Sequence, residues 1–90
     1  MYLYSLIPVG FNQSSVKINI PEQVCLVTNI KVYFFEQNEE NPNDFLFKKY
    51  NVVVPTIILF SKNGNIIGRW DNPTDAHDII NTINTININK

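Results

Sequence analysis

Residues 49–64 read Lys-Tyr-Asn-Val-Val-Val-Pro-Thr-Ile-Ile-Leu-Phe-Ser-Lys-Asn-Gly, and this stretch decides how the rest of the chain is interpreted. The apolar run at 52–60 indicates a strand. Pro55 interrupts this run and cannot donate a hydrogen bond to a sheet. Asn63-Gly64 separates the run from a second apolar segment, residues 66–70, and Asn-Gly in such a place indicates a β-hairpin. The stretch therefore predicts two antiparallel strands.

The sequence before this stretch predicts two further strands. Residues 2–9 are aromatic and aliphatic and indicate a buried strand, and residues 30–36 are so apolar that we expect a strand in the centre of the sheet. Between them, residues 16–20 alternate as a strand does, whereas Pro21 and the residues after it are typical of a first helical turn. These residues alone leave strand and helix open for 14–20.

Two more helices are predicted by capping signals. Residues 41–44, Asn-Pro-Asn-Asp, supply a cap, a proline and an acid for a short helix, and Asn51 suits the left-handed residue that closes it. A last helix is expected to begin within residues 72–75, with Thr74 or Asn72 as its cap. Its isoleucines form one apolar stripe at positions 79, 80, 83 and 86.

Together these elements predict an α/β fold in the order βαβαββα. Two strand–helix units demand parallel pairing, and the hairpin adds antiparallel strands, so we expect a four-stranded mixed sheet with helices on both faces. With 90 residues, the chain is expected to form a single domain over 1–90.

Composition excludes several classes of function. The net charge of −1 gives no basic excess for a nucleic acid, and the longest apolar runs are far shorter than the ~20 residues that cross a membrane. The N-terminal residues lack the basic start of a secretory signal, so we expect a cytoplasmic protein. One cysteine and one histidine leave no multi-histidine or cysteine-rich metal site, and no cofactor is predicted.

The order of elements, and residues 49–64 in particular, resemble the thioredoxin fold in its minimal form. In that family a Lys-Tyr-Gly helix end leads into Val-x-x-Pro-Thr, an apolar strand ending in Phe, and a Lys-x-Gly hairpin; Asn51 stands in place of the glycine. The resemblance implies a cis Val54–Pro55 peptide bond, beside which backbone groups pair with an extended peptide. It also implies that residues 14–29 form one helix, kinked at Pro21.

The redox pair of the family is missing. The family's Cys-x-x-Cys opens this first helix, and counting back from Pro21 places its two cysteines at Gln13 and Val16. Thiol–disulfide exchange needs one thiolate to attack and a second thiol to resolve the mixed disulfide, so no catalytic residue is predicted. Cys25 lies farther along the helix and is expected to pack in the core, as free cysteines usually do.

The sequence thus predicts a redox-inactive thioredoxin-like domain that serves as a protein-binding or complex-assembly module. Its partner is an unidentified protein or a second copy in a homodimer, and the hairpin edge at 66–70 is a competing surface for self-association. The predicted binding groove lies at the carboxyl ends of the parallel strands. It comprises Phe11, Asn12, Gln13, Val54, Pro55 and Asn72.

Two alternatives remain at this point. One is a thiol oxidoreductase that uses Cys25 alone. The other is a fold-switching regulator like the clock protein KaiB, which has a thioredoxin-like sequence without the redox pair. Residues 12–16 resemble the start of its first helix, and the strand-like pattern at 16–20 suits two competing local structures.

Overall fold

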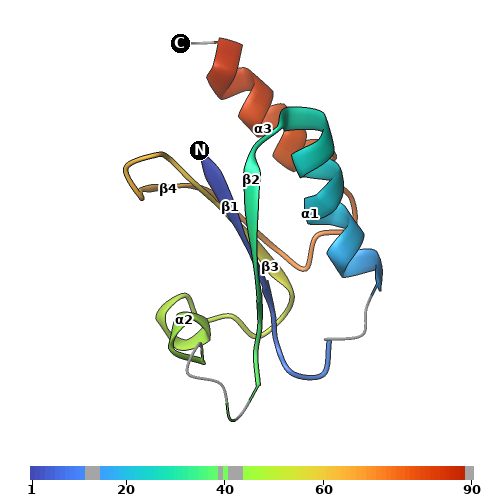
Figure 1. The fold of residues 1–90 in the computed structure, drawn as a ribbon, viewed down its shortest axis with the longest axis vertical. Coiled ribbons are helices and arrows are strands. Elements are labelled where there is room, and N and C mark those ends of the chain that lie inside the picture. The colour runs from blue at the N-terminus through green and yellow to red at the C-terminus, as the bar shows by residue number, and fades with distance from the viewer. Residues whose placement is uncertain (12–14, 39, 41–43, 89–90) are drawn as a thin grey trace.

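The computed structural model describes residues 1–11, 15–38, 40 and 44–88, and these form three helices and a four-stranded sheet (Figure 1). Their order is the predicted βαβαββα. The elements are β1 (Tyr2–Ile7), α1 (Ser15–Thr28), β2 (Lys31–Glu36), α2 (Asp44–Lys49), β3 (Thr56–Phe60), β4 (Ile66–Asp71) and α3 (His77–Ile88).

The strands lie in the order β2-β1-β3-β4. β1 is parallel to β2 and antiparallel to β3, and β3 is antiparallel to β4, which confirms the mixed sheet. The prediction that the apolar strand at 30–36 is central was wrong, because β3 takes the second side of β1 and leaves β2 at an edge. The side chains of Tyr33 and Phe34 are consequently 40% and 49% exposed.

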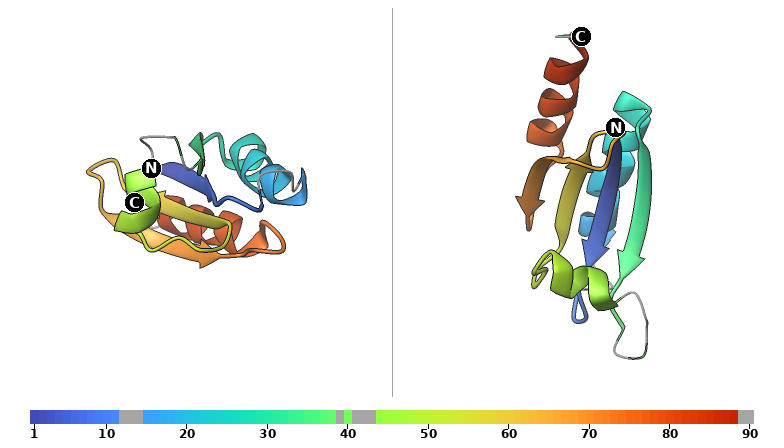
Figure 2. Two further views of the ribbon diagram at one scale, coloured as in Figure 1. Left: turned by 90° about the horizontal axis from the view of Figure 1, so that it is seen from below. Right: turned by 90° about the vertical axis from the view of Figure 1, so that its left-hand side faces the viewer.

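Helices cover both faces of the sheet, as predicted (Figure 2). Successive residues of β1 and β3 point to opposite faces, so each strand contributes to two apolar clusters. The cluster under α1 and α3 contains Leu3, Ile20, Val24, Ile30, Ile57, Leu59, Ala76, Ile79 and Ile83. The cluster under α2 contains Leu6, Phe47, Val52, Ile58 and Phe60.

Residues 15–28 form a single helix that includes Pro21, which confirms the helix implied by the resemblance. A helix places Ile20 and Val24, four residues apart, on the same face, and both are buried against the sheet. Burial of this face outweighs the strand-like alternation at 16–20. The Asn29 N–H then donates to the Cys25 carbonyl at 2.8 Å, and Asn29 takes a φ of 60° to end the helix.

The turn predictions around residues 49–64 are confirmed. Asn51 adopts a φ of 51°, and the N–H groups of Asn51 and Val52 donate to the carbonyls of Lys48 and Phe47, the pattern that closes a helix through a left-handed residue. Gly64 has a φ of 86° and donates to Ser61 in the β3–β4 hairpin. The predicted cap at 41–43 lies outside the described residues.

Two predicted boundaries were wrong. Residues 52–55 precede β3 instead of belonging to it, because Pro55 lacks the N–H that a sheet needs. α3 begins at His77, and neither Thr74 nor Asn72 caps it: Asn72 has a left-handed φ of 51°, and the Asp75 carboxylate accepts the His77 N–H at 2.9 Å. The predicted isoleucine stripe does face the sheet, with Ile79 and Ile83 fully buried.

Candidate functional site

One end of the sheet gathers the three loops that the sequence analysis singled out. Because β1 is antiparallel to β3 and β3 is antiparallel to β4, the ends of β1 and β4 lie beside the start of β3. The loops after β1, before β3 and after β4 therefore meet at this end, where α1 and α3 also begin (Figure 1). The Asn72 N–H donates to the Pro55 carbonyl at 2.6 Å and holds two of these loops together.

The structure places four of the six predicted groove residues. Pro55 is buried, Val54 and Phe11 are half-buried, and Asn72 is exposed. Only Pro55 and Asn72 are shown in direct contact. Asn12 and Gln13, the other two residues of the predicted groove, lie outside the described residues.

The predicted cis Val54–Pro55 bond was wrong. No peptide bond among the described residues is cis, so this bond is trans. The trans form is the favoured one for a bond before proline, by roughly 0.5–1 kcal/mol. The Val54 carbonyl accepts a hydrogen bond from the Thr56 hydroxyl at 2.8 Å. The peptide pairing implied at Val54 rested on the cis bond and loses support without it, and this contact already uses one of the two lone pairs of the Val54 carbonyl.

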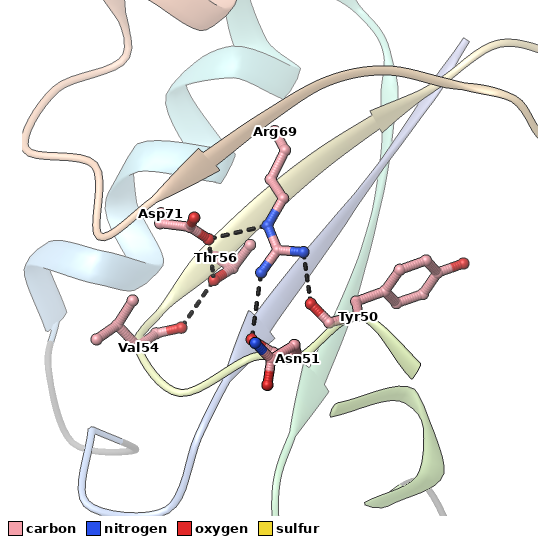
Figure 3. Close-up of polar contacts among 6 residues, drawn as sticks. All are labelled: Tyr50, Asn51, Val54, Thr56, Arg69 and Asp71. Carbon is pink, nitrogen blue, oxygen red and sulfur yellow. Dashed lines mark hydrogen bonds and ion pairs between the residues drawn. The ribbon is translucent and has the colours of Figure 1, made fainter. Parts of the chain in front are cut away.

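A polar cluster that the sequence analysis missed stabilises this end of the sheet (Figure 3). Thr56, only 1% exposed, shares its hydroxyl proton between the Val54 carbonyl and the Asp71 carboxylate, 2.8 and 3.0 Å away. Arg69 Nε lies 3.0 Å from the same carboxylate oxygen. The sequence does contain a signal for the ion pair in this cluster. Arg69 and Asp71 have opposite charges and lie two residues apart in a predicted strand, so their side chains share a face of the sheet.

The same arginine ties β4 to the end of α2. Its guanidinium donates to the carbonyls of Tyr50 and Asn51, which follow the last turn of the helix. Carbonyls at a helix end lack partners within the helix, so a cation is favourable there. The cluster of Arg69, Asp71 and Thr56 therefore acts as a structural clamp between α2, β3 and β4.

Cys25 is half-buried, not enclosed in the core as predicted. It lies in the second half of α1 and lines a cavity of about 370 Å³ between this helix and β2. Thiolates gain stabilisation at the N-terminal end of a helix, which is not where Cys25 lies. No second cysteine exists in the chain to resolve a mixed disulfide.

Other functional groups are sparse. His77 is exposed at the start of α3. Among the described residues, no three His, Cys, Asp or Glu side chains are arranged to hold a metal ion. Nor does this part of the chain contain a helix with the length and apolarity to span a membrane.

Comparison with known proteins identifies the fold. No protein-family model and no curated protein matches this chain. Among solved structures, thioredoxin 1 from the thermophilic eubacterium Thermosipho africanus matches with a TM-score of 0.70 and 24% identity over 100% of both chains. Thioredoxin-2, a component of the malaria parasite protein secretion machinery, matches with a TM-score of 0.69 and 20% identity over 93% of this chain and 81% of its own.

A third structure, described as a malarial protein, gives a TM-score of 0.67 and 19% identity over 93% of both chains. The chain therefore has the thioredoxin fold, as the resemblance at residues 49–64 implied. Identities at this level establish the architecture and do not carry over an activity.

Proposed function

We propose that this thioredoxin-fold chain is redox-inactive and serves as a protein-binding module. The proposal rests mainly on the cysteine content of the chain. The sequence has one cysteine, Cys25, and it lies in the second half of α1. Disulfide exchange requires a thiolate that attacks one sulfur of the substrate and a second thiol that releases the product. Cys25 can form a mixed disulfide but has no intramolecular thiol to resolve it.

The proposed binding surface is the loop end of the sheet, around Phe11, Val54, Pro55 and Asn72. The contact between Asn72 and Pro55 supports it, because it holds two exposed loops in one arrangement. A hollow of about 350 Å³ lies beside these loops, between the end of β4 and the start of α3. The Val54 carbonyl already accepts one hydrogen bond within the chain, and we expect side chains of these loops to make most of the contacts with a partner.

The redox part of the proposal is tested by reduction of insulin disulfides with dithiothreitol as the electron source. We expect the protein to add nothing to the rate given by the reductant alone. The Cys25→Ser variant serves as the matched control. Turnover in the wild type that vanishes in this variant would establish single-thiol catalysis and overturn the proposal.

The binding part is tested on a partner that co-purifies with the native protein and is then identified. We expect Phe11→Ala combined with Asn72→Lys to weaken its affinity by more than about fivefold, since residues central to an interface cost over ~1 kcal/mol when changed. Asn63→Lys, in the hairpin at the opposite end of the sheet, is the control for added charge. Equal affinities for all variants would place the partner elsewhere.

A further inference from the structure

A hollow of about 520 Å³ lies between β4 and α3, and we call it the β4–α3 hollow. Its apolar part consists of Trp70 and Ile86, which also pack against the core cluster under α1 and α3. Spacings of three and four residues align the polar lining on one side of α3. This lining consists of Asp78, Asn81, Thr82 and Thr85. Volumes of roughly 300–1,000 Å³ are typical of sites for small ligands.

The indole of Trp70 lies along β4, over Gly68. The two residues are two positions apart on the strand, so they share a face of the sheet. A β-carbon at position 68 would lie 2.7 Å from Cη2 of the indole, which is closer than any real contact of this kind. The absence of a side chain at Gly68 therefore allows the ring to lie flat. Trp70 is only half-buried, so part of its ring faces the β4–α3 hollow.

The polar face of the β4–α3 hollow offers more acceptors than donors of hydrogen bonds. The hydroxyl groups of Thr82 and Thr85 donate to the carbonyls of Asp78 and Asn81, each at 2.8 Å. Both hydroxyl protons are thus used within the helix, and the lone pairs of these oxygens remain for a ligand. The Asp78 carboxylate only accepts, whereas the Asn81 amide both donates and accepts. A ligand that fits this face is rich in donors.

The charge of the β4–α3 hollow favours a neutral ligand. Asp78 is the one charged residue in its lining, so a phosphate or another anion finds no cation there. Asp78 also lies in the first turn of α3, where the helix dipole partly balances its negative charge and disfavours a bound cation. A purely apolar ligand would remove water from the polar side chains without replacing their hydrogen bonds, which costs free energy.

We propose that the β4–α3 hollow binds a neutral oligosaccharide, with one sugar ring stacked on the Trp70 indole. A sugar ring carries C–H groups on its faces and hydroxyl groups around its rim. The C–H hydrogens have a small positive charge, which suits the electron-rich face of an indole. The rim hydroxyls donate to the oxygens of Thr82, Thr85 and Asp78 and pair with the Asn81 amide. One ligand class thus satisfies the aromatic wall, the excess of acceptors and the missing cation.

The test is titration of the full chain with maltohexaose, laminarihexaose and chitohexaose, three neutral oligosaccharides of different linkage and substitution. Each is added up to about 5 mM, since an open site with few hydrogen bonds corresponds to a Kd of about 1 mM. Trp70 is the single tryptophan, so its fluorescence reports on the stacking directly. We expect a saturable change with at least one probe, together with shifts of backbone amide signals in β4 and α3. No response to any of the three would overturn the proposal.

Substitutions separate the aromatic wall from the polar face. We expect Trp70→Ala to weaken binding at least tenfold, measured by amide shifts, and Gly68→Ala to weaken it as well, because the added β-carbon displaces the indole. Asn81→Ala should weaken it about three- to tenfold through the loss of hydrogen bonds. Asn84→Ala is the matched control, because Asn84 is exposed on the same helix but does not line the hollow. Circular dichroism checks that each variant is folded. Equal affinities of Asn81→Ala and Asn84→Ala would contradict the contact face.

Two further measurements separate this proposal from the proposed function and from a charged ligand. Phe11→Ala with Asn72→Lys should leave the oligosaccharide affinity unchanged, because neither residue lines the β4–α3 hollow. Loss of oligosaccharide binding in this loop variant would contradict the hollow as the site, while the test of the loops on a protein partner stands by itself. The affinity should change less than about twofold between about 50 and 500 mM NaCl, since salt screens charged ligands. A strong loss at high salt would overturn the neutral ligand.

Discussion

Thr56→Val tests whether the polar clamp holds the loop before β3 in place. The Thr56 side chain is 1% exposed, and its hydroxyl lies 2.8 Å from the Val54 carbonyl and 3.0 Å from the Asp71 carboxylate. Valine has nearly the same shape, so the substitution leaves no cavity. It removes the hydrogen bonds and leaves a methyl group facing two oxygen atoms.

The magnitude follows from these contacts. A neutral hydrogen bond contributes about 0.5–1.5 kcal/mol and one to a charged group about 1.5–3 kcal/mol. Because one proton serves both acceptors, we expect a loss near the lower sum, about 2 kcal/mol. An unfolding entropy of about 2.1 cal/mol/K per residue converts this to a fall in Tm of roughly 10 °C for a domain of this length.

The assay is thermal unfolding followed by circular dichroism and by the fluorescence of Trp70, the single tryptophan, which is next to Asp71. Thr85→Val is the control, because its exposed hydroxyl donates only to the Asn81 carbonyl one turn earlier in α3. That change should alter stability by less than ~0.5 kcal/mol. Equal Tm values for Thr56→Val and Thr85→Val would refute the claim that the Thr56 hydrogen bonds stabilise the fold.

Three further outcomes are expected. Ile83→Ala should lower the free energy of unfolding by about 2–5 kcal/mol in urea titration, whereas Ile88→Ala, at an 80% exposed position of the same helix, should change it by less than ~0.5 kcal/mol. Burial, with smaller effects from neighbouring tyrosines, raises the pKa of Tyr4 above 10.0. The stability that the neutral Tyr4 side chain contributes is therefore fully present below pH 10.0 and is lost as the pH rises through the folded-state pKa. Absorbance titration should show a component that ionises above pH 10.0 and is absent in Tyr4→Phe. Asn51→Ala should cost about 1 kcal/mol and Asn51→Gly much less, because the φ of 51° disfavours a β-carbon; similar melting curves for the two would contradict this.

The predictions that succeeded rest on residues that determine their own local geometry. Asn51 and Asn63-Gly64 tolerate left-handed or tight-turn backbone, so their positions fix where a helix ends and a hairpin turns. The isoleucine stripe of α3 is equally local, because helical periodicity alone places its members on one face. These signals predicted the end of α2, the β3–β4 hairpin and the buried face of α3, whereas the helix over residues 15–28 was expected only from the resemblance.

The site was less predictable because it depends on pairing between distant segments. Thr56 meets Asp71 only through the register of β3 with β4, where the two residues lie opposite each other. The bond before Pro55 is trans, although the Val-Pro-Thr motif implied a cis bond. A motif shared with a fold thus predicted the position of the loop but not its backbone geometry.

The position of β2 shows why an apolar strand is ambiguous in sequence. A strand with apolar residues on both faces is usually covered by other elements on both faces and paired with a strand at each edge. A central position in the sheet provides these neighbours within one chain. β1 occupies that place here, between β2 and β3. Within the described residues, the side chains of Tyr33 and Phe34 are therefore only partly covered, and both are at least 40% exposed. The prediction of a central strand therefore failed because apolar composition does not distinguish a strand with two neighbours from an edge strand whose apolar side chains are partly exposed.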